Sequence, residues 1–146
     1  MSWSTIASAE VLNEFTPAEQ AALNNIQATQ PTASSALDTI LNSTVQAARG
    51  AIIAGQNALD LPNTIPDQIR QDVIAIARWK WLNSFPALKA LQTKGREKAH
   101  DDGQATLKAI AARDIKVEPA PNATGGSVAF QASRRKATAH KLSGLI

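Results

Sequence analysis

The chain has 146 residues, a length typical of one domain. It contains 28 alanines but only five valines and no tyrosine, which favours helices over a β-sandwich or barrel. The absence of cysteine excludes disulfides and thiolate-bound metal centres. No apolar run approaches the roughly 18 residues of a membrane span, and no basic-then-apolar leader opens the chain. We therefore expect a soluble protein of a cytosol-like compartment with no membrane partner.

Charge is distributed unevenly along the chain. Residues 1–114 carry ten Lys or Arg and eleven Asp or Glu, whereas residues 115–146 carry five basic residues and one acidic residue. A globular DNA-binding domain would spread basic charge over a folded face. A basic tail is instead suited to binding a polyanion, or an acidic or grooved surface on another protein. We divide the chain into a helical body, residues 1–116, and an extended basic C-terminal arm, residues 117–146.

The N-terminal part predicts two short helices. Residues 8–15 form the first, with Ser8 as its N-cap. The sequence Thr16-Pro17-Ala18-Glu19 then combines a capping box with proline at the first helical position, which indicates the start of a second helix. This helix is expected to run to about residue 27 and to bury Leu23 and Ile26.

A long amphipathic helix follows, from residue 32 or 33 to residue 54. Its apolar residues recur every three or four positions, and Arg49 is assigned to the opposite, solvated face. Gly50 lies inside the helix, which indicates close packing of a neighbour at that point. The next segment, residues 57–65, reads as a loop whose Leu59 and Leu61 are expected to pack on the body.

The most buried helix is predicted over residues 69–85, where apolar side chains cover more than half of the circumference. Capping chemistry at Thr64, like that at Thr16, is expected to open it, and Pro86 to break or kink it. Residues 87–98 have a mixed pattern, and a last helix is expected over residues 105–114. The pair Trp79 and Trp81 could stack on nucleic-acid bases, but residues two apart on a helix point to different sides. We therefore expect one of them in the core and the other at an interface or half exposed. The predicted core comprises Leu37, Ile40, Leu41, Ile69, Val73, Ile76, Trp79, Leu107 and Ile110.

The arm has a pattern of its own. Residues 115–118 are consistent with a short strand, residues 119–126 with an extended Pro/Gly linker, and residues 127–133 alternate like a half-buried strand. A lone strand is not stable, so the latter needs an edge to pair with on another chain. A disordered solubilising tail is the plain alternative, but the apolar residues at the end of the chain argue against it. The predicted partner-binding residues are Val128, Phe130, Arg134, Arg135, Lys136, Lys141, Leu142, Leu145 and Ile146.

The sequence contains few candidates for catalytic, metal-binding or phosphate-binding residues. His100 precedes two aspartates, but no second ligand cluster accompanies it, so we interpret it as part of an exposed polar turn between helical pieces. Gly125-Gly126 lacks the lysine and the strand–loop–helix context of a phosphate-binding loop. No nucleophile–base pair is indicated. The sequence therefore predicts a protein that is not an enzyme and that has no cofactor and no metal.

Three stretches together resemble a known family. They are the Pro/Leu loop from Leu59 to Pro66, the run Ile69-x-x-Asp-Val-Ile-Ala-Ile-Ala-Arg-Trp79, and the helix end Leu107-Lys-Ala-Ile-Ala-Ala-Arg-Asp-Ile115. Over residues 5–117 the chain resembles the head–tail connector proteins of tailed bacteriophages, also called neck adaptor or head-completion proteins.

The resemblance implies a small all-α subunit of about four to five helices that assembles into a ring, generally of twelve copies. The ring would sit under the portal protein in the neck of the virion, after assembly in the host cytoplasm. It would carry the next neck or tail-completion protein and let genomic DNA pass. In this family C-terminal segments commonly clasp the portal or a neighbouring subunit. The alternative is a DNA-binding accessory protein, for packaging or regulation, that contacts phosphates through residues 134–136 and Lys141.

Overall fold

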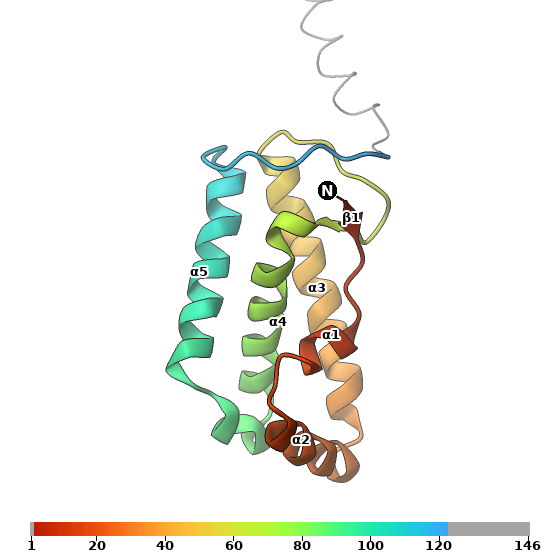
Figure 1. Ribbon diagram of the computed structural model, residues 1–146, viewed down its shortest axis with the longest axis vertical. Helices are drawn as coiled ribbons and strands as arrows, with labels where there is room; N and C mark the ends of the chain where they lie inside the picture. Colours follow the sequence, from red (N-terminus) through yellow and green to blue (C-terminus); the bar gives the residue numbers. More distant parts are fainter. Residues whose placement is uncertain (1, 123–146) are drawn as a thin grey trace, which may run out of the picture.

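The computed structural model describes residues 2–122, and helices dominate this part of the chain (Figure 1). The α-helices are α1 (Ser8–Leu12), α2 (Pro17–Thr29), α3 (Thr32–Ala54), α4 (Arg70–Ser84) and α5 (Lys94–Ala111). Two 3₁₀ helices, η1 (Asp67–Ile69) and η2 (Pro86–Leu91), flank α4. Strands β1 (Trp3–Ser4) and β2 (Ile65–Pro66) form one antiparallel pair, with Trp3 opposite Pro66. The expected small, mostly helical bundle is confirmed.

The three long helices α3, α4 and α5 pack along one another and form the body of the bundle (Figure 1). Helix α1 lies against α3 and α4, and α2 contacts α3 and η2 at one end. Strands β1 and β2 lie at the opposite end, where the chain after α5 also crosses the bundle. The two ends of the bundle are therefore formed by different elements. Short helices lie at one end, and strands and extended chain lie at the other.

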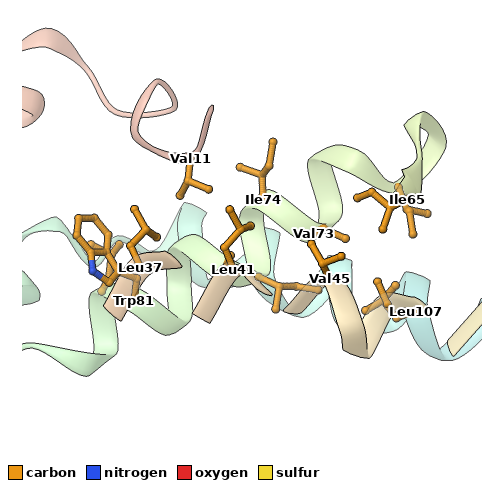
Figure 2. Packing of buried hydrophobic residues seen from close by; sticks show 14 of the residues in the cluster. Val11, Leu37, Leu41, Val45, Ile65, Val73, Ile74, Trp81 and Leu107 are labelled. Atoms are coloured by element: carbon orange, nitrogen blue, oxygen red, sulfur yellow. The ribbon is translucent and has the colours of Figure 1, made fainter. Parts of the chain in front are cut away.

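The core lies between α3, α4 and α5 and is closed by α1 (Figure 2). Seven of the nine predicted core residues are buried; they are Leu37, Leu41, Ile69, Val73, Ile76, Leu107 and Ile110. Ile40 is only partly buried. The assignment of Trp79 to the core is wrong, because it is half-buried while Trp81 is fully buried. Residues two apart on a helix point to different sides, so only one of the two indoles can face inward.

Trp81 is fixed by more than its apolar surroundings. Its Nε1–H donates to the carbonyl oxygen of Ala33 at 3.0 Å, which satisfies the buried donor. Its ring also meets the Phe15 ring edge-on, with 6.3 Å between centroids. The indole thus joins α4 to the start of α3 and to the segment before α2.

The predicted capping box at the start of α2 is confirmed. Glu19 donates its backbone N–H to the Thr16 hydroxyl oxygen at 3.3 Å, and the Glu19 carboxylate accepts the Thr16 N–H at 3.0 Å. The helix then continues to Thr29, two residues beyond the expected end, and it buries Leu23 while Ile26 is partly buried.

Two other predicted caps are wrong. In α1 the N-cap is Ala7, whose N–H donates to the Glu10 carboxylate, and the helix ends at Leu12 rather than residue 15. Before α4, the Thr64 hydroxyl donates to the carbonyl of Leu61 instead of capping a helix. The 3₁₀ helix η1 intervenes, and α4 begins at Arg70 without a side-chain cap.

Helix α5 begins eleven residues earlier than expected, at Lys94 instead of position 105. The Thr93 hydroxyl accepts the N–H of Arg96 and caps it. Gly103 is buried against α4, where an added Cβ would lie 2.9 Å from the carbonyl oxygen of Asp72. This glycine therefore permits close helix packing and does not break the helix. His100 consequently lies inside α5 and not in a turn.

Glycine packing in α3 also differs from the expectation. At Gly50 no neighbouring atom lies within 4 Å of the position that a Cβ would occupy, so no neighbour packs there. The close approach is instead at Gly55, where a Cβ would collide with the carbonyl oxygen of Ile110. In the following loop Leu59 packs against the core as expected, but Leu61 is 54% exposed.

Candidate interaction site at the base of the C-terminal arm

Three segments that are far apart in the sequence meet at one end of the bundle (Figure 1). They are residues 2–4, residues 60–68 and residues 114–122, and side-chain hydrogen bonds join them. Helix α5 ends as Arg113 adopts a left-handed φ of 67° and the Asp114 N–H bonds to the carbonyl of Ala109. This turn directs the chain across the end of the bundle, where the predicted arm begins.

The side chain of Gln68 holds the first residues of this crossing segment. Its Nε2 donates to the carbonyl oxygen of Lys116 at 2.8 Å, and its Oε1 accepts the N–H of Glu118 at 2.9 Å. The backbone N–H of Gln68 donates to the Glu118 carboxylate at 3.1 Å. A side-chain amide thus takes the place that a neighbouring strand would take in a β-ladder. The short strand expected over residues 115–118 is therefore not formed.

Buried apolar contacts reinforce these hydrogen bonds. Val117 is 4% exposed and belongs to the core, as does Trp3 at 7%. The Trp3 Nε1–H donates to the carbonyl oxygen of Glu118 at 3.3 Å. Further along, the Asn122 N–H donates to the Asp60 carboxylate at 3.1 Å. The packing of the body therefore continues past the predicted boundary at residue 116 and includes the chain up to Asn122.

The N-terminal strand is tied to the same site through Asp67. The carboxylate of Asp67 accepts hydrogen bonds from the hydroxyls of Ser2, at 2.8 Å, and Ser4, at 3.2 Å. The Asp67 N–H donates to the carbonyl of Ser2 at 3.0 Å. These hydrogen bonds, that of Ser2 first, lower the pKa of the Asp67 carboxyl. The ionised carboxylate therefore holds β1 in place beside the arm base.

The assignment of Arg49 to a solvated face is wrong, since this residue is only 9% exposed. Its guanidinium donates to the backbone carbonyls of Leu61, at 3.0 Å, and Asp60, at 3.3 Å, and also to that of Thr64. Burial lowers the pKa of Arg49, and the nearby Asp60 carboxylate counteracts this shift. Arg49 thereby fixes the loop that carries Asp60, the anchor of Asn122. Its spacing could have revealed this, because it stands four residues after Val45 and three before Ile52, both buried.

The predicted partner-binding residues of the arm, from Val128 to Ile146, lie outside the described residues. The structure describes residues 116–122, the base of the arm that precedes them. Between residues 2 and 122, no group of three or more His, Asp or Glu side chains is arranged to hold a metal ion. Within the same range, no helix has both the length and the apolarity needed to cross a membrane.

His100 is the only histidine in the described part of the chain. Its Nδ1 lies 3.1 Å from the Asp101 carboxylate, and its ring centroid lies 6.4 Å from that of Trp79. The two rings form a small half-buried contact between α4 and α5. No further titratable partner joins His100 in the hydrogen bonds of residues 2–122.

The chain matches no family model, no curated protein and no solved structure. The resemblance over residues 5–117 therefore rests on the sequence pattern itself.

Proposed function

We propose that this protein is a structural adaptor of a tailed-phage neck, without catalytic activity. In this proposal the helical body assembles into a homo-oligomeric ring, of twelve copies if it follows the family it resembles. The ring docks beneath the portal protein in the virion, carries the next neck or tail-completion protein, and leaves a channel for genomic DNA. The C-terminal arm makes the attachment to the portal.

The observation that carries this proposal is the anchored base of the arm. Gln68, Trp3 and Asp60 hold residues 116–122 across one end of the bundle. Residues 2–122 have eleven basic and twelve acidic side chains, whereas residues 123–146 have four basic ones and no acidic one. The basic residues of the arm, which begin twelve positions after Asn122, therefore follow a fixed point on a nearly neutral body. In a ring, repetition of such arms lets each bind weakly while the whole assembly is held firmly.

Truncation tests the proposal. The cut belongs after Asn122, because Val117 is part of the core and Asn122 is bonded to Asp60. The full chain is expected to form rings and to attach to its portal in negative-stain images. Residues 1–122 should keep the helical circular dichroism spectrum but fail to attach. A truncated chain that attaches as well as the full chain would show that the arm is not the portal-binding element.

The charge of the arm favours a second candidate, a DNA-binding accessory protein. Its four basic residues are Arg134, Arg135, Lys136 and Lys141. If all four neutralised phosphates, the logarithm of the affinity would fall with the logarithm of salt concentration with a slope of about −3.6, at about 0.9 per phosphate. Replacing the four residues by alanine should then abolish DNA binding. Portal attachment that persists while DNA binding is lost would favour the adaptor.

A further inference from the structure

A pocket of about 280 Å³ opens between α4 and α5, beside the segment that follows α1. The two helices run side by side in the bundle (Figure 1). Its volume lies at the lower end of the range for small-molecule sites, which is about 300–1,000 Å³. The pocket, which we call the α4–α5 pocket, is lined by four charged side chains and by small apolar ones; they include Glu14, Asp72, Arg78 and Asp102, with Ala75 and Ala99.

Arg78 brings an unpaired positive charge to the α4–α5 pocket. Its half-buried guanidinium donates no hydrogen bond to residues 2–122 and forms no ion pair with them. The Nε atom is buried, so the two terminal nitrogens are the donors that are open to a ligand. Burial lowers the pKa of Arg78 and the nearby Arg96 lowers it further, while Glu14 and Glu19 counteract the shift. Since Glu19 is bound by Arg96 and Glu14 is exposed, the guanidinium is suited to an anionic group from outside the body.

Asp72 brings an unpaired negative charge to the same pocket. Its half-buried carboxylate has no hydrogen bond and no ion pair within residues 2–122, and neither of its oxygens is buried. Asp102 on α5 adds a second carboxylate, whose ion pair with Lys98 is exposed. Burial and then the charge of Asp102 raise the pKa of the Asp72 carboxyl. The part of the pocket around Asp72 is therefore suited to a cationic group.

Asp72 and Arg78 do not neutralise each other. They form no ion pair, and their positions, six residues apart on α4, are offset by about 9 Å along the helix axis at about 1.5 Å per residue. A half-buried charge without a partner is unfavourable, because it has lost part of its hydration. One ligand with a positive group at one end and a negative group at the other would pair both charges at once.

We propose that the α4–α5 pocket binds a linear dipolar ligand of the dipeptide class, with its ammonium group at Asp72 and its carboxylate at Arg78. Two extended residues span about 7 Å, so their end groups reach charges offset by about 9 Å through hydrogen bonds of about 2.8 Å. A single amino acid cannot reach both charges, because its ammonium and carboxylate groups are attached to the same carbon. Ala75 and Ala99 leave space for small side chains between the two ends. The site involves neither the arm nor the portal, so this inference goes beyond the proposed function.

Titration with alanylalanine, followed by NMR of the isotope-labelled full chain, tests the proposal. We expect saturable shifts of the amide signals of Ala75 and Ala99. N-acetyl-alanylalanine lacks the ammonium group, and alanylalanine amide lacks the carboxylate. Each should bind at least tenfold more weakly, because each leaves one pocket charge without its partner. Free alanine should also bind at least tenfold more weakly.

Substitutions of the two pocket charges test the same contacts from the side of the protein. Arg78→Gln and Asp72→Asn should each weaken the binding of alanylalanine at least tenfold. The matched controls Lys80→Gln, exposed on α4, and Asp38→Asn, exposed on α3, should leave the binding unchanged.

The proposal is overturned if alanylalanine shows no saturable binding to the wild-type chain. Equal binding of the acetylated or the amidated dipeptide would also overturn it, as would unchanged binding to a folded Arg78→Gln or Asp72→Asn variant. The comparison of ligands uses the wild-type chain, so it decides the question even where a variant fails to fold. Because no portal and no DNA are present, a negative result here leaves the proposed function as it stands.

Discussion

The two ends of the bundle are held together by different interactions. At the end formed by α2 and the start of α5, the Arg96 guanidinium binds the Glu19 carboxylate through two hydrogen bonds of 2.8 Å. Arg96 also donates to the carbonyl of Leu91 and lies 4.7 Å above the Phe15 ring. At the arm end, neutral contacts of Gln68 and Trp3 are joined by hydrogen bonds to the carboxylates of Asp60, Asp67 and Glu118. No ion pair joins residues 2–4, 60–68 and 114–122 to one another. One end is thus held by the Glu19–Arg96 ion pair, which we call the charged clamp. The other end is held by hydrogen bonds to an extended chain.

The two ends of the bundle therefore differ in what they support: the Glu19–Arg96 end supports the stability of the body, and the arm end supports the position of the arm. The Glu19–Arg96 end joins elements of the body to one another. The arm end positions a segment that leads into the most basic part of the sequence. Substitutions at the first end should therefore change global stability, whereas those at the second should mainly change local order at the arm base.

The largest effect is expected at Trp81, near the Glu19–Arg96 end. Trp81→Ala removes a fully buried indole and should lower the free energy of unfolding by about 3–5 kcal/mol. Trp79→Ala, two residues away and half-buried, should lower it by about 1 kcal/mol. Urea denaturation of both variants measures the difference. Equal losses for the two tryptophans would contradict the assignment of Trp81 as the core residue.

The charged clamp predicts a dependence on pH. Hydrogen bonds from Arg96 and then from the Thr16 backbone lower the pKa of Glu19 from 4.5 to about 2. A carboxyl whose pKa is lower in the folded state stabilises the protein above pH 4.5, and this contribution is lost as the pH falls from about 4.5 to about 2. Because the Glu19 side chain is 22% exposed, we expect about 2 kcal/mol, less than the full shift would yield.

The control for this effect is a second glutamate. Glu19→Gln should flatten the fall in stability between pH 4.5 and about 2 when unfolding by urea is followed across that range. Glu97→Gln, exposed in the first turn of α5 and without an ion pair among the described residues, should leave it unchanged. If the wild type and Glu19→Gln lose stability in parallel, the clamp does not stabilise the fold.

Features that depend on nearby residues could be predicted from the sequence, whereas those that depend on distant ones could not. The capping box at Thr16 and the bounds of α3 follow from residues a few positions apart. The sequence does not predict the start of α5 at Lys94, because Gly95 and Gly103 locally disfavour a helix. The close packing of Gly103 on Asp72 of α4 makes glycine suitable there. The sequence predicts the site only in part for the same reason. The Gln68 contacts to Lys116 and Glu118 join residues about 50 positions apart.

A smaller, local effect is expected at the arm end. Gln68→Leu removes both side-chain hydrogen bonds to residues 116–118, of which each contributes about 1 kcal/mol. Exchange of the Glu118 amide hydrogen should become roughly tenfold faster, which corresponds to about 1.4 kcal/mol. Gln71→Leu, at an exposed glutamine in α4 without a side-chain hydrogen bond in the described structure, should leave that exchange rate unchanged. An unaltered Glu118 amide in Gln68→Leu would show that the glutamine does not hold the arm base.

The last pair of effects concerns two glycines near the arm end of α3, and they should have opposite signs. Gly50 is exposed inside the helix with open space around it, so Gly50→Ala should raise the free energy of unfolding by about 0.5–1 kcal/mol through helix propensity. Gly55→Ala should lower the free energy of unfolding, because the new Cβ would collide with the backbone carbonyl of Ile110, which cannot move without shifting the end of α5.

A shift of the end of α5 in Gly55→Ala would also reach Arg113 and residues 116–118, which Gln68 binds. Gly55→Ala should therefore speed exchange at Glu118 as well, whereas Gly50→Ala should not, and urea denaturation with hydrogen exchange on the same pair measures both. A stabilising Gly55→Ala would mean that α3 and α5 do not approach closely there, and that the arm base does not depend on their contact.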